Sequence, residues 1–315
     1  EDSAFLDRFD RWLDQRAGRP TPVTPLETLS EEIGGGRLLL KREDLCDTGS
    51  YTKTSAIAFG LLAREMGCDW LVGETATGDF GVALASVAAS MGLEARLFVG
   101  REDLEAEEFN LQRIEQLGAV VETVDTSARG RKAACAEALR HWATHSTDAL
   151  YCPSSLAMPD PYPRFFSHFL SVIGAETRVQ MERRGRRPEY VIAPIGSGAF
   201  GVGFLGEFVA ESDAQIVGVE AEGEEREGKH AASLAYGEPG VFQGSHTYVL
   251  QDEHGQILSP SSIAGGLCVP NVGPQHAHWS EAGEVHYVTA SDAEALEATR
   301  RLAKTEGIIV SLEAG

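Results

Sequence analysis

The sequence predicts an α/β fold in which open, mostly parallel sheets are flanked by helices. Two observations support this. Short apolar runs alternate with helical segments along the 315 residues, and the runs lack the strict alternation of a strand with one solvated face. Because parallel strands need a crossover connection, which is usually a helix, this order is typical of an open α/β architecture.

The expected elements follow one another in regular order. Each expected strand is a short apolar run, which suits burial on both faces of a parallel sheet; the runs are 37–40, 70–73, 95–99, 120–124, 190–193 and 216–219. Helical segments separate them or follow them, at 53–66, 80–91, 104–117, 128–143, 163–182, 200–211 and 291–306. Two segments break the order: a Pro- and Ser-rich crossing over 153–163, and a hairpin over 247–258 that turns at His254-Gly255.

Composition narrows the class of protein. A formal net charge of −21 argues against nucleic-acid binding, because neutralising phosphates requires clustered Lys and Arg. Five cysteines without CxxC spacing indicate neither a disulfide framework nor a zinc site. No apolar run reaches the roughly 18 residues of a membrane span, and no signal peptide is recognised before Glu1. We therefore expect a cytoplasmic protein that binds neither membranes nor nucleic acid.

The turn Glu74–Gly81 follows an expected strand and opens an expected helix. Unpaired N–H groups and the positive end of the helix dipole at such a turn attract a carboxylate or phosphate. Glu74 stands at the carboxyl end of its strand, where α/β folds place ligands, and it could act as a general acid or base. The alternative is a tight turn in which Thr77 only caps the helix.

A second glycine-rich turn, Ile195–Gly201, lies between the strand at 190–193 and the next helix. Glycines allow the backbone to approach an anion closely, but such a loop can equally serve helix packing. It departs from the dinucleotide fingerprint unless Glu220 binds a ribose. His276 and His278 lie two residues apart without other ligands at metal-binding spacing, so no metal site is expected. The pair Lys229-His230 is typical of a solvated helix start.

Short segments along nearly the whole chain match one family in the same order. They are Gly18–Pro22, Leu40–Leu45, Glu74-Thr75, Pro161–Pro163, Ser171–Gly174, Gly228–Ser233, Leu250–Glu253, Val272–Pro274 and Thr305–Ile309. In this set the chain resembles the β subunit of tryptophan synthase, a family of fold-type II pyridoxal-phosphate (PLP) enzymes. The resemblance implies two lobes with a ligand cleft between them: 1–17 with 51–169 as the smaller lobe, and 18–50 with 170–315 as the larger. Members join a serine-derived aminoacrylate to indole.

The resemblance also implies roles for individual residues. Glu74 matches the acid/base glutamate of the family, and Glu313 matches a glutamate near the pyridoxal ring. Thr75, Gly78 and Gly81 match the loop that holds the substrate carboxylate, and Asn110 matches an asparagine without assigned chemistry. A homodimer and an α-like partner subunit are expected on the same basis.

The departures from the family pattern fall in the pocket. Thr52 stands where the family has its Schiff-base lysine, and a threonine hydroxyl cannot form that bond. Lys53 would need a one-residue deletion to replace it, since its side chain points about 100° away on a helix. The other departures are Tyr51 for histidine, Ala76, Asp79 and Phe80 for glycine, glutamine and histidine, Gly198-Ala199-Phe200 for a segment with Ser-Asn, and Cys268 for aspartate.

Three hypotheses for the function follow. The first is a repurposed pocket with PLP-independent acid/base chemistry on a small carboxylate-bearing or aromatic substrate. The second is a PLP-dependent β-replacement or β-elimination lyase, with Lys53 shifted in register or Thr52 an engineered replacement. The third is a non-catalytic partner subunit. The candidate catalytic residues are Glu74, Asp79 and Lys53; those for the cofactor are Tyr51, Thr52, Gly196, Ser197, Gly198, Ala199, Phe200 and Glu313; those for the substrate are Thr75, Ala76, Thr77, Gly78, Phe80 and Cys268.

Overall fold

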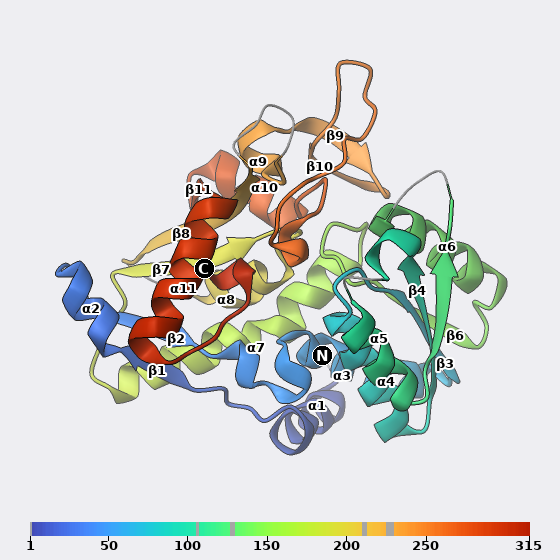
Figure 1. Ribbon diagram of the computed structural model, residues 1–315. Helices are drawn as coiled ribbons and strands as arrows, with labels where there is room; N and C mark the ends of the chain where they lie inside the picture. Colours follow the sequence, from blue (N-terminus) through green and yellow to red (C-terminus); the bar gives the residue numbers. More distant parts are fainter. Residues whose placement is uncertain (1, 105–106, 127–129, 210–212, 225–229) are drawn as a thin grey trace. The chain divides into compact units, whose positions relative to one another are not determined.

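The computed structural model describes residues 2–104, 107–126, 130–209, 213–224 and 230–315, and the chain divides into two compact units (Figure 1). The first unit runs to Pro22 and continues over Arg42–Ser154; the second contains Val23–Lys41 and Ser155–Gly315. The division assigns 18–22 and 42–50 to the first unit and 155–169 to the second, unlike the expected lobes. Within the segment 23–41, β1 (Val23–Leu26) pairs with β2 (Leu38–Lys41), so the two strands of this segment form a sheet of their own.

The first unit is built on a four-stranded parallel sheet in the order β5-β4-β3-β6. Every strand of this sheet is a short run; they are β3 (Trp70–Glu74), β4 (Glu94–Gly100), β5 (Val120–Val124) and β6 (Ala149–Cys152). The helices are α1 (Ser3–Arg16), α3 (Thr52–Met66), α4 (Asp79–Met91), α5 (Glu108–Gln116) and α6 (Gly130–Thr144), with short 3₁₀ turns η1 (Glu43–Leu45), η2 (Asp47–Gly49) and η3 (Arg101–Asp103). β3 is central and almost fully buried, so the residues at its carboxyl end lie at the middle of the sheet edge.

The second unit contains a three-stranded parallel sheet in the order β11-β8-β7 and two antiparallel pairs. The strands of the parallel sheet are β7 (Tyr190–Ile195), β8 (Gln215–Gly223) and β11 (His286–Ser291). The antiparallel pairs are β1 with β2, and β9 (Glu238–Phe242) with β10 (Ser245–Val249). Its helices are α2 (Glu27–Ile33), α7 (Tyr162–Arg183), α8 (Ala199–Val209), α9 (Ser233–Tyr236), α10 (Pro274–Ala282) and α11 (Asp292–Glu306), with 3₁₀ turns η4 (Gly265–Leu267) and η5 (Leu312–Ala314). The mostly parallel α/β prediction is thus confirmed.

The expected hairpin differs from the observed one. The regular pair is β9–β10, which turns at Gln243-Gly244, and only its second strand reaches into 247–258. A turn does form at Asp252–Gly255, but a single bridge between Gln251 and Ile257 follows it. Gln243 and Gly244 both have positive φ, as residues in such a tight turn require, and this sequence lacks the Asn-Gly or Asp-Gly signal of a hairpin.

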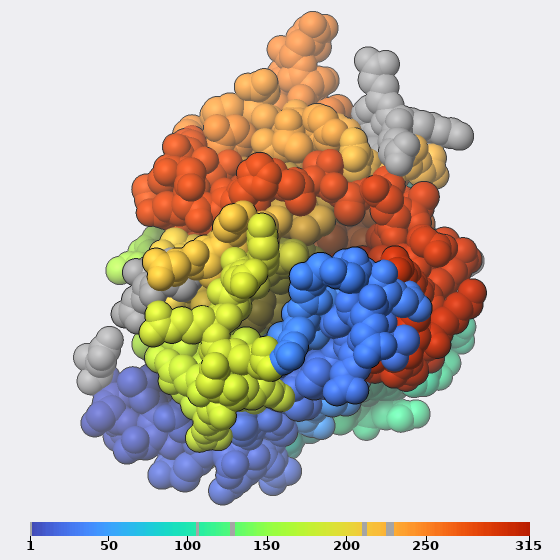
Figure 2. All heavy atoms as spheres, turned by 90° about the vertical axis from the view of Figure 1, so that its left-hand side faces the viewer, coloured from blue at the N-terminus to red at the C-terminus, as the bar shows by residue number. Residues whose placement is uncertain are grey.

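Two helix contacts hold the second unit together. α7 crosses α8 at glycines: a Cβ on Gly203 would lie 2.5 Å from the Leu170 carbonyl oxygen, and one on Gly174 would lie 2.8 Å from that of Phe204. α2 lies beside α11 (Figure 2), where Leu29 N–H donates to Glu306 at 2.7 Å and Arg301 pairs with Glu32 at 3.0 Å. The α7–α8 contact fixes α8 and therefore the turn that precedes it.

Within the described residues, no helix is both long enough and apolar enough to cross a membrane. The same part of the chain holds no group of three or more His, Cys, Asp or Glu residues that could bind a metal ion.

Candidate functional site

Glu74 is a buried carboxylate at the carboxyl end of β3, and only 1% of it is exposed. Its Oε2 accepts a hydrogen bond from Tyr151 Oη at 2.8 Å, and its Oε1 accepts from Ser154 N and Oγ at 3.0 and 2.9 Å. Burial, and then the charge of Glu74, raise the pKa of Tyr151 well above its ordinary value, so the phenol remains a donor. Three donors therefore fix the carboxylate of Glu74 at the sheet edge.

Hydrogen bonds and close packing hold the turn after β3. Thr75 N–H donates to the Phe98 carbonyl at 3.0 Å, and Thr75 Oγ1 accepts from Gly78 N at 3.1 Å. Gly78 has φ of 78°, and a Cβ at this position would overlap the side chain of Asn110, whose Nδ2 donates to the Thr77 carbonyl at 2.9 Å. Asn110, to which the sequence assigned no chemistry, thus holds the turn in place.

A chain of hydrogen bonds links the position of the expected lysine to Asp79. Thr52 Oγ1 donates to Ser50 Oγ at 3.0 Å, and Ser50 Oγ donates to Asp79 Oδ2 at 2.9 Å. Thr77 Oγ1 donates to the other carboxylate oxygen, Oδ1, at 2.5 Å. Thr52 and Asp79 are therefore joined through Ser50, a residue outside the predicted site. We call Ser50, Thr52, Thr77 and Asp79 the hydroxyl–carboxylate network.

Lys53 does not belong to this network. Its Nζ donates to Ser86 Oγ at 2.6 Å and pairs with Asp47 at 3.1 Å, and 2% of its side chain is exposed. Burial lowers the pKa of Lys53, while Asp47 acts in the opposite direction. The amine lies against α4 and η2, so the structure does not bring it to the position of Thr52.

The turn from β7 into α8 is shaped by close packing. A Cβ on Gly196 would lie 2.8 Å from Leu267 Cα, and one on Gly198, whose φ is 93°, would overlap the ring of His276. The Ser197 carbonyl accepts from Gly273 N at 2.8 Å. Ala199 begins α8, and the first N–H groups of a helix have no partner within it, which leaves the polarity of an anion site.

His276 supports this turn, and among the described residues it belongs to no group of three or more His, Cys, Asp or Glu side chains. It is fully buried; Nε2 lies 2.9 Å from the Gly198 carbonyl and Nδ1 lies 2.8 Å from Tyr287 Oη. Burial lowers the pKa of His276 to about 4, so the ring is neutral near neutral pH. His278 is exposed. No sequence pattern indicated the role of His276, because its partners lie 11 and 78 residues away.

Glu220, considered for a ribose site, serves another purpose. It is 1% exposed and accepts from Leu234 N and Ala235 N at 2.9 and 3.0 Å, at the start of α9. Burial raises the pKa of Glu220 to about 7, although these N–H groups act against it. Glu220 therefore pairs with the N–H groups at the start of α9, within the second unit.

The remaining predicted residues lie in separate environments. Cys268 Sγ donates to the Ser262 carbonyl at 3.3 Å, and burial raises the pKa of Cys268 to about 11. Glu313 accepts from Gly266 N at 2.8 Å. Phe200 stacks on Phe204 with ring centroids 5.4 Å apart. Phe80 is buried, Ala76 is partly buried and Tyr51 precedes α3, while Gly228 and Lys229 lie outside the described residues.

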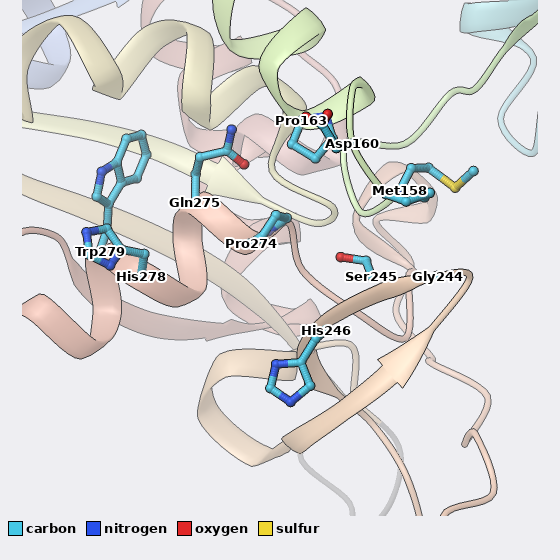
Figure 3. A pocket seen from close by; sticks show the side chains of 11 residues that line it. Met158, Asp160, Pro163, Gly244, Ser245, His246, Pro274, Gln275, His278 and Trp279 are labelled. Carbon is cyan, nitrogen blue, oxygen red and sulfur yellow. The ribbon is translucent and has the colours of Figure 1, made fainter.

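A cavity of about 510 Å³ opens elsewhere in the second unit (Figure 3). It is lined by the start of α7, the β9–β10 turn and α10, including Met158, His246, Gln275 and Trp279. No residue predicted for the site lines it.

The chain matches known proteins over almost its full length. A model of the family described as "Pyridoxal-phosphate dependent enzyme" matches residues 15–315. The tryptophan synthase beta chain of Shouchella clausii is 43% identical over 314 residues, which cover 99% of this chain and 78% of that protein. The beta chain from Stenotrophomonas maltophilia strain R551-3 is 42% identical over 315 residues with the same coverage.

Two solved structures share the fold. A threonine deaminase from T.th. matches with a TM-score of 0.72 and 23% identity over 98% of this chain and 89% of its own. An L-serine ammonia-lyase from the fungus Rhizomucor miehei matches with a TM-score of 0.69 and 22% identity over 93% of this chain and 83% of its own. At these identities the two structures support the fold alone.

Proposed function

Because this chain belongs to the pyridoxal-phosphate-dependent enzyme family, we propose that it is a lyase or synthase of the tryptophan synthase β type that acts by β-replacement or β-elimination on a small amino acid. The relatives do not support the PLP-independent chemistry favoured by the sequence; they favour the second hypothesis, in which PLP is used. The observation that carries the proposal is Glu74, held by three donors at the carboxyl end of the central strand.

The residues present fit the phosphate group of PLP, but they do not offer an amine for its covalent attachment. The turn Gly196–Phe200, at the start of α8, suits a phosphate group. Covalent attachment requires an amine, but position 52 offers a hydroxyl and the amine of Lys53 is bound to Ser86 and Asp47. This is the physical reason why a register-shifted Lys53 does not fit. Our proposal is therefore that PLP is held reversibly, without a bond to this chain.

The chain's own residues would then supply proton transfer and orientation. When bound, PLP supplies an electron sink for the carbon that carries the amino group. Glu74 would move the proton. A carboxylate has about four lone pairs, two on each oxygen. Ser154 N and Oγ occupy those of Oε1 and Tyr151 occupies one of Oε2, so an acceptor position remains on Oε2. Tyr151 Oη, 3.4 Å from Cys135 Sγ, fixes the orientation of the carboxylate.

A second candidate keeps Glu74 as acid or base but uses no PLP, and Thr52 is the observation that favours it. We also propose that the chain forms a homodimer with an α-like partner, because the relatives are named as beta chains. In a complex of that kind, the non-catalytic partner role is the third candidate.

Turnover of L-serine and indole separates these candidates. The purified chain would be assayed with and without added PLP, with product measured by mass spectrometry. We expect turnover only with PLP. Turnover that is indifferent to PLP would contradict the proposal in favour of the second candidate. Absence of turnover under both conditions, including in the presence of an α-like partner, would favour the non-catalytic role.

A further inference from the structure

We propose that Arg131 is a positioning residue for Glu74, which it orients through the hydroxyl group of Ser154. Arg131 lies in the first turn of α6, and all three residues belong to the first unit. The inference rests on the proposed function for the proton-transfer role of Glu74. It goes further by stating which oxygen of Glu74 is left to exchange the proton, and which residue determines this.

The direction of each hydrogen bond between these residues follows from the chemistry of Arg131. Its Nη2 lies 2.8 Å from Ser154 Oγ, and a guanidinium group has donors only, so the hydroxyl oxygen of Ser154 must accept. The one hydroxyl proton of Ser154 is then donated to Glu74 Oε1, at 2.9 Å. The peptide N–H of Ser154 donates to the same oxygen at 3.0 Å. Both lone pairs of Oε1 are therefore occupied.

An ion pair does not explain the position of the Arg131 side chain. Other arginines of the chain contact a carboxylate, as Arg101 does with Asp125 at 2.6 Å. Among the described residues, no carboxylate oxygen lies within 4.0 Å of Arg131. Burial raises the pKa of Asp103, and the charge of Arg131 acts in the opposite direction from beyond that distance. Within the described part of the chain, the hydrogen bond of Arg131 goes to Ser154.

The packing of α6 fixes where Arg131 stands. The end of β4 meets the start of α6 at two glycines, and a Cβ on Gly100 would lie 2.7 Å from Gly130 Cα. A side chain at position 100 would push the start of α6 away, and Arg131 with it. Because β4 and β6 flank β3 in a parallel sheet, the residues that follow these strands meet at the edge where Glu74 lies. The close approach at Gly100 thus brings the guanidinium group to Ser154.

This arrangement leaves one oxygen of Glu74 to exchange a proton. Oε1 is saturated by Ser154, whereas Oε2 accepts from Tyr151 at 2.8 Å and retains one acceptor position. Without Arg131, the hydroxyl group of Ser154 can rotate away from Oε1, and the carboxylate of Glu74 is then free to reorient. A displacement of about 1 Å in a reacting group can lower the rate strongly, so the loss of Arg131 affects kcat more than substrate binding.

Arg131→Met tests the inference in the PLP-supplemented chain with L-serine and indole. We expect kcat to fall by about 10- to 100-fold while KM stays nearly unchanged, because the variant removes the donors but keeps an unbranched side chain. Arg131→Lys retains a charged donor and should recover part of the loss. In a chain that carries Ser154→Ala, Arg131→Met should have little further effect, because the hydroxyl through which Arg131 acts is gone. Arg140→Met is the matched control in α6; Arg140 pairs with Glu137 at 2.6 Å, and its loss should leave kcat unchanged.

A measurement on the PLP-free chain is independent of turnover. Glutamate labelled with carbon-13 at the side-chain carboxyl gives an NMR resonance for Glu74, which is assigned by its absence in Glu74→Gln. We expect this resonance to move in Arg131→Met and to stay in place in Arg140→Met, and thermal melting would verify that each variant is folded. If Arg131→Met folds poorly, Arg131→Ala takes its place, because alanine has the highest helix propensity.

An unmoved Glu74 resonance in the folded variant would overturn the inference. A rise in KM with kcat unchanged would also overturn it, because Arg131 would then bind the ligand directly. Equal losses of kcat with and without Ser154→Ala would do the same, since Arg131 would act independently of the hydroxyl. A moved resonance in a chain without PLP-dependent turnover supports the inference and contradicts the proposed function alone, so the two failures can be told apart.

Discussion

Glu74 and Thr52 show how much depends on a single side chain. Glu74 is held by Tyr151 and Ser154, which come from the end of β6 and the residues after it, 77 and 80 positions away. Glu74 was placed correctly at a strand end from the sequence, but no pattern in the chain indicated these partners. For Thr52, the sequence predicted the missing amine, and the structure adds where the neighbouring amine goes: Lys53 contacts Ser86 and Asp47.

Replacing Glu74 with Gln tests its role in proton transfer. The amide keeps the shape but removes the proton-transfer group, so we expect kcat of the PLP-supplemented chain to fall by about 10² to 10⁴. Steady-state kinetics with L-serine and indole would measure the change, and circular dichroism would verify the fold. A Glu74→Gln chain with full kcat would show that Glu74 only anchors the sheet edge.

At the scale of elements, most helices and central strands were predicted closely, whereas some edge strands were missed. The expected helix at 163–182 is observed as α7, Tyr162–Arg183. β11 and β6 were missed; both are edge strands of their sheets, and β11 is also of mixed polarity. The Gly-rich turn before α8 was predicted, but not the ring of His276 that fills the space beside Gly198.

The α7–α8 contact depends on the absence of a side chain at Gly203. We expect Gly203→Ala to lower the free energy of unfolding by about 1 to 3 kcal/mol, because the new methyl group would meet the backbone of α7. Gly206→Ala is a matched control in the same helix. Its nearest neighbour is 3.7 Å away, so it should be neutral or stabilise by up to about 1 kcal/mol. Urea denaturation measures both, and equal effects would contradict the packing explanation.

The turn before α8 gives a second matched pair. Gly198 and Gly118 both have positive φ, but only Gly198 has a ring against it. Gly118→Ala should cost about 1 to 2 kcal/mol for the left-handed backbone alone. Gly198→Ala should cost distinctly more, because His276 must also move. Chemical denaturation would compare the two, and a smaller cost at Gly198 would show that the turn is not packed as described.

For the molecule as a whole, buried ionisable groups link stability to pH. Glu220 has a folded-state pKa of about 7, above its ordinary value of 4.5, because burial disfavours its charge. The folded state therefore retains a proton that the unfolded chain has released. The stability contributed by Glu220 is present in full below about pH 4.5 and is lost as the pH rises through about 7.

Glu220→Gln should remove this dependence. Relative to the variant, the parent chain is expected to lose on the order of 2 to 3 kcal/mol of unfolding free energy as the pH rises from 4.5 to 8. Urea denaturation at several pH values would measure the difference between the two chains. A difference that stays constant across this range would contradict the assignment of the shifted group.

The central claim is that a chain of the PLP-dependent family binds its cofactor without a bond to lysine. The most direct test is borohydride reduction of the chain saturated with PLP, followed by mass spectrometry of the peptide containing Thr52 and Lys53. We predict no cofactor adduct on this peptide, and release of PLP on gel filtration. With Thr52→Lys the adduct should form at position 52. A reduced adduct on Lys53 of the parent chain would contradict the claim.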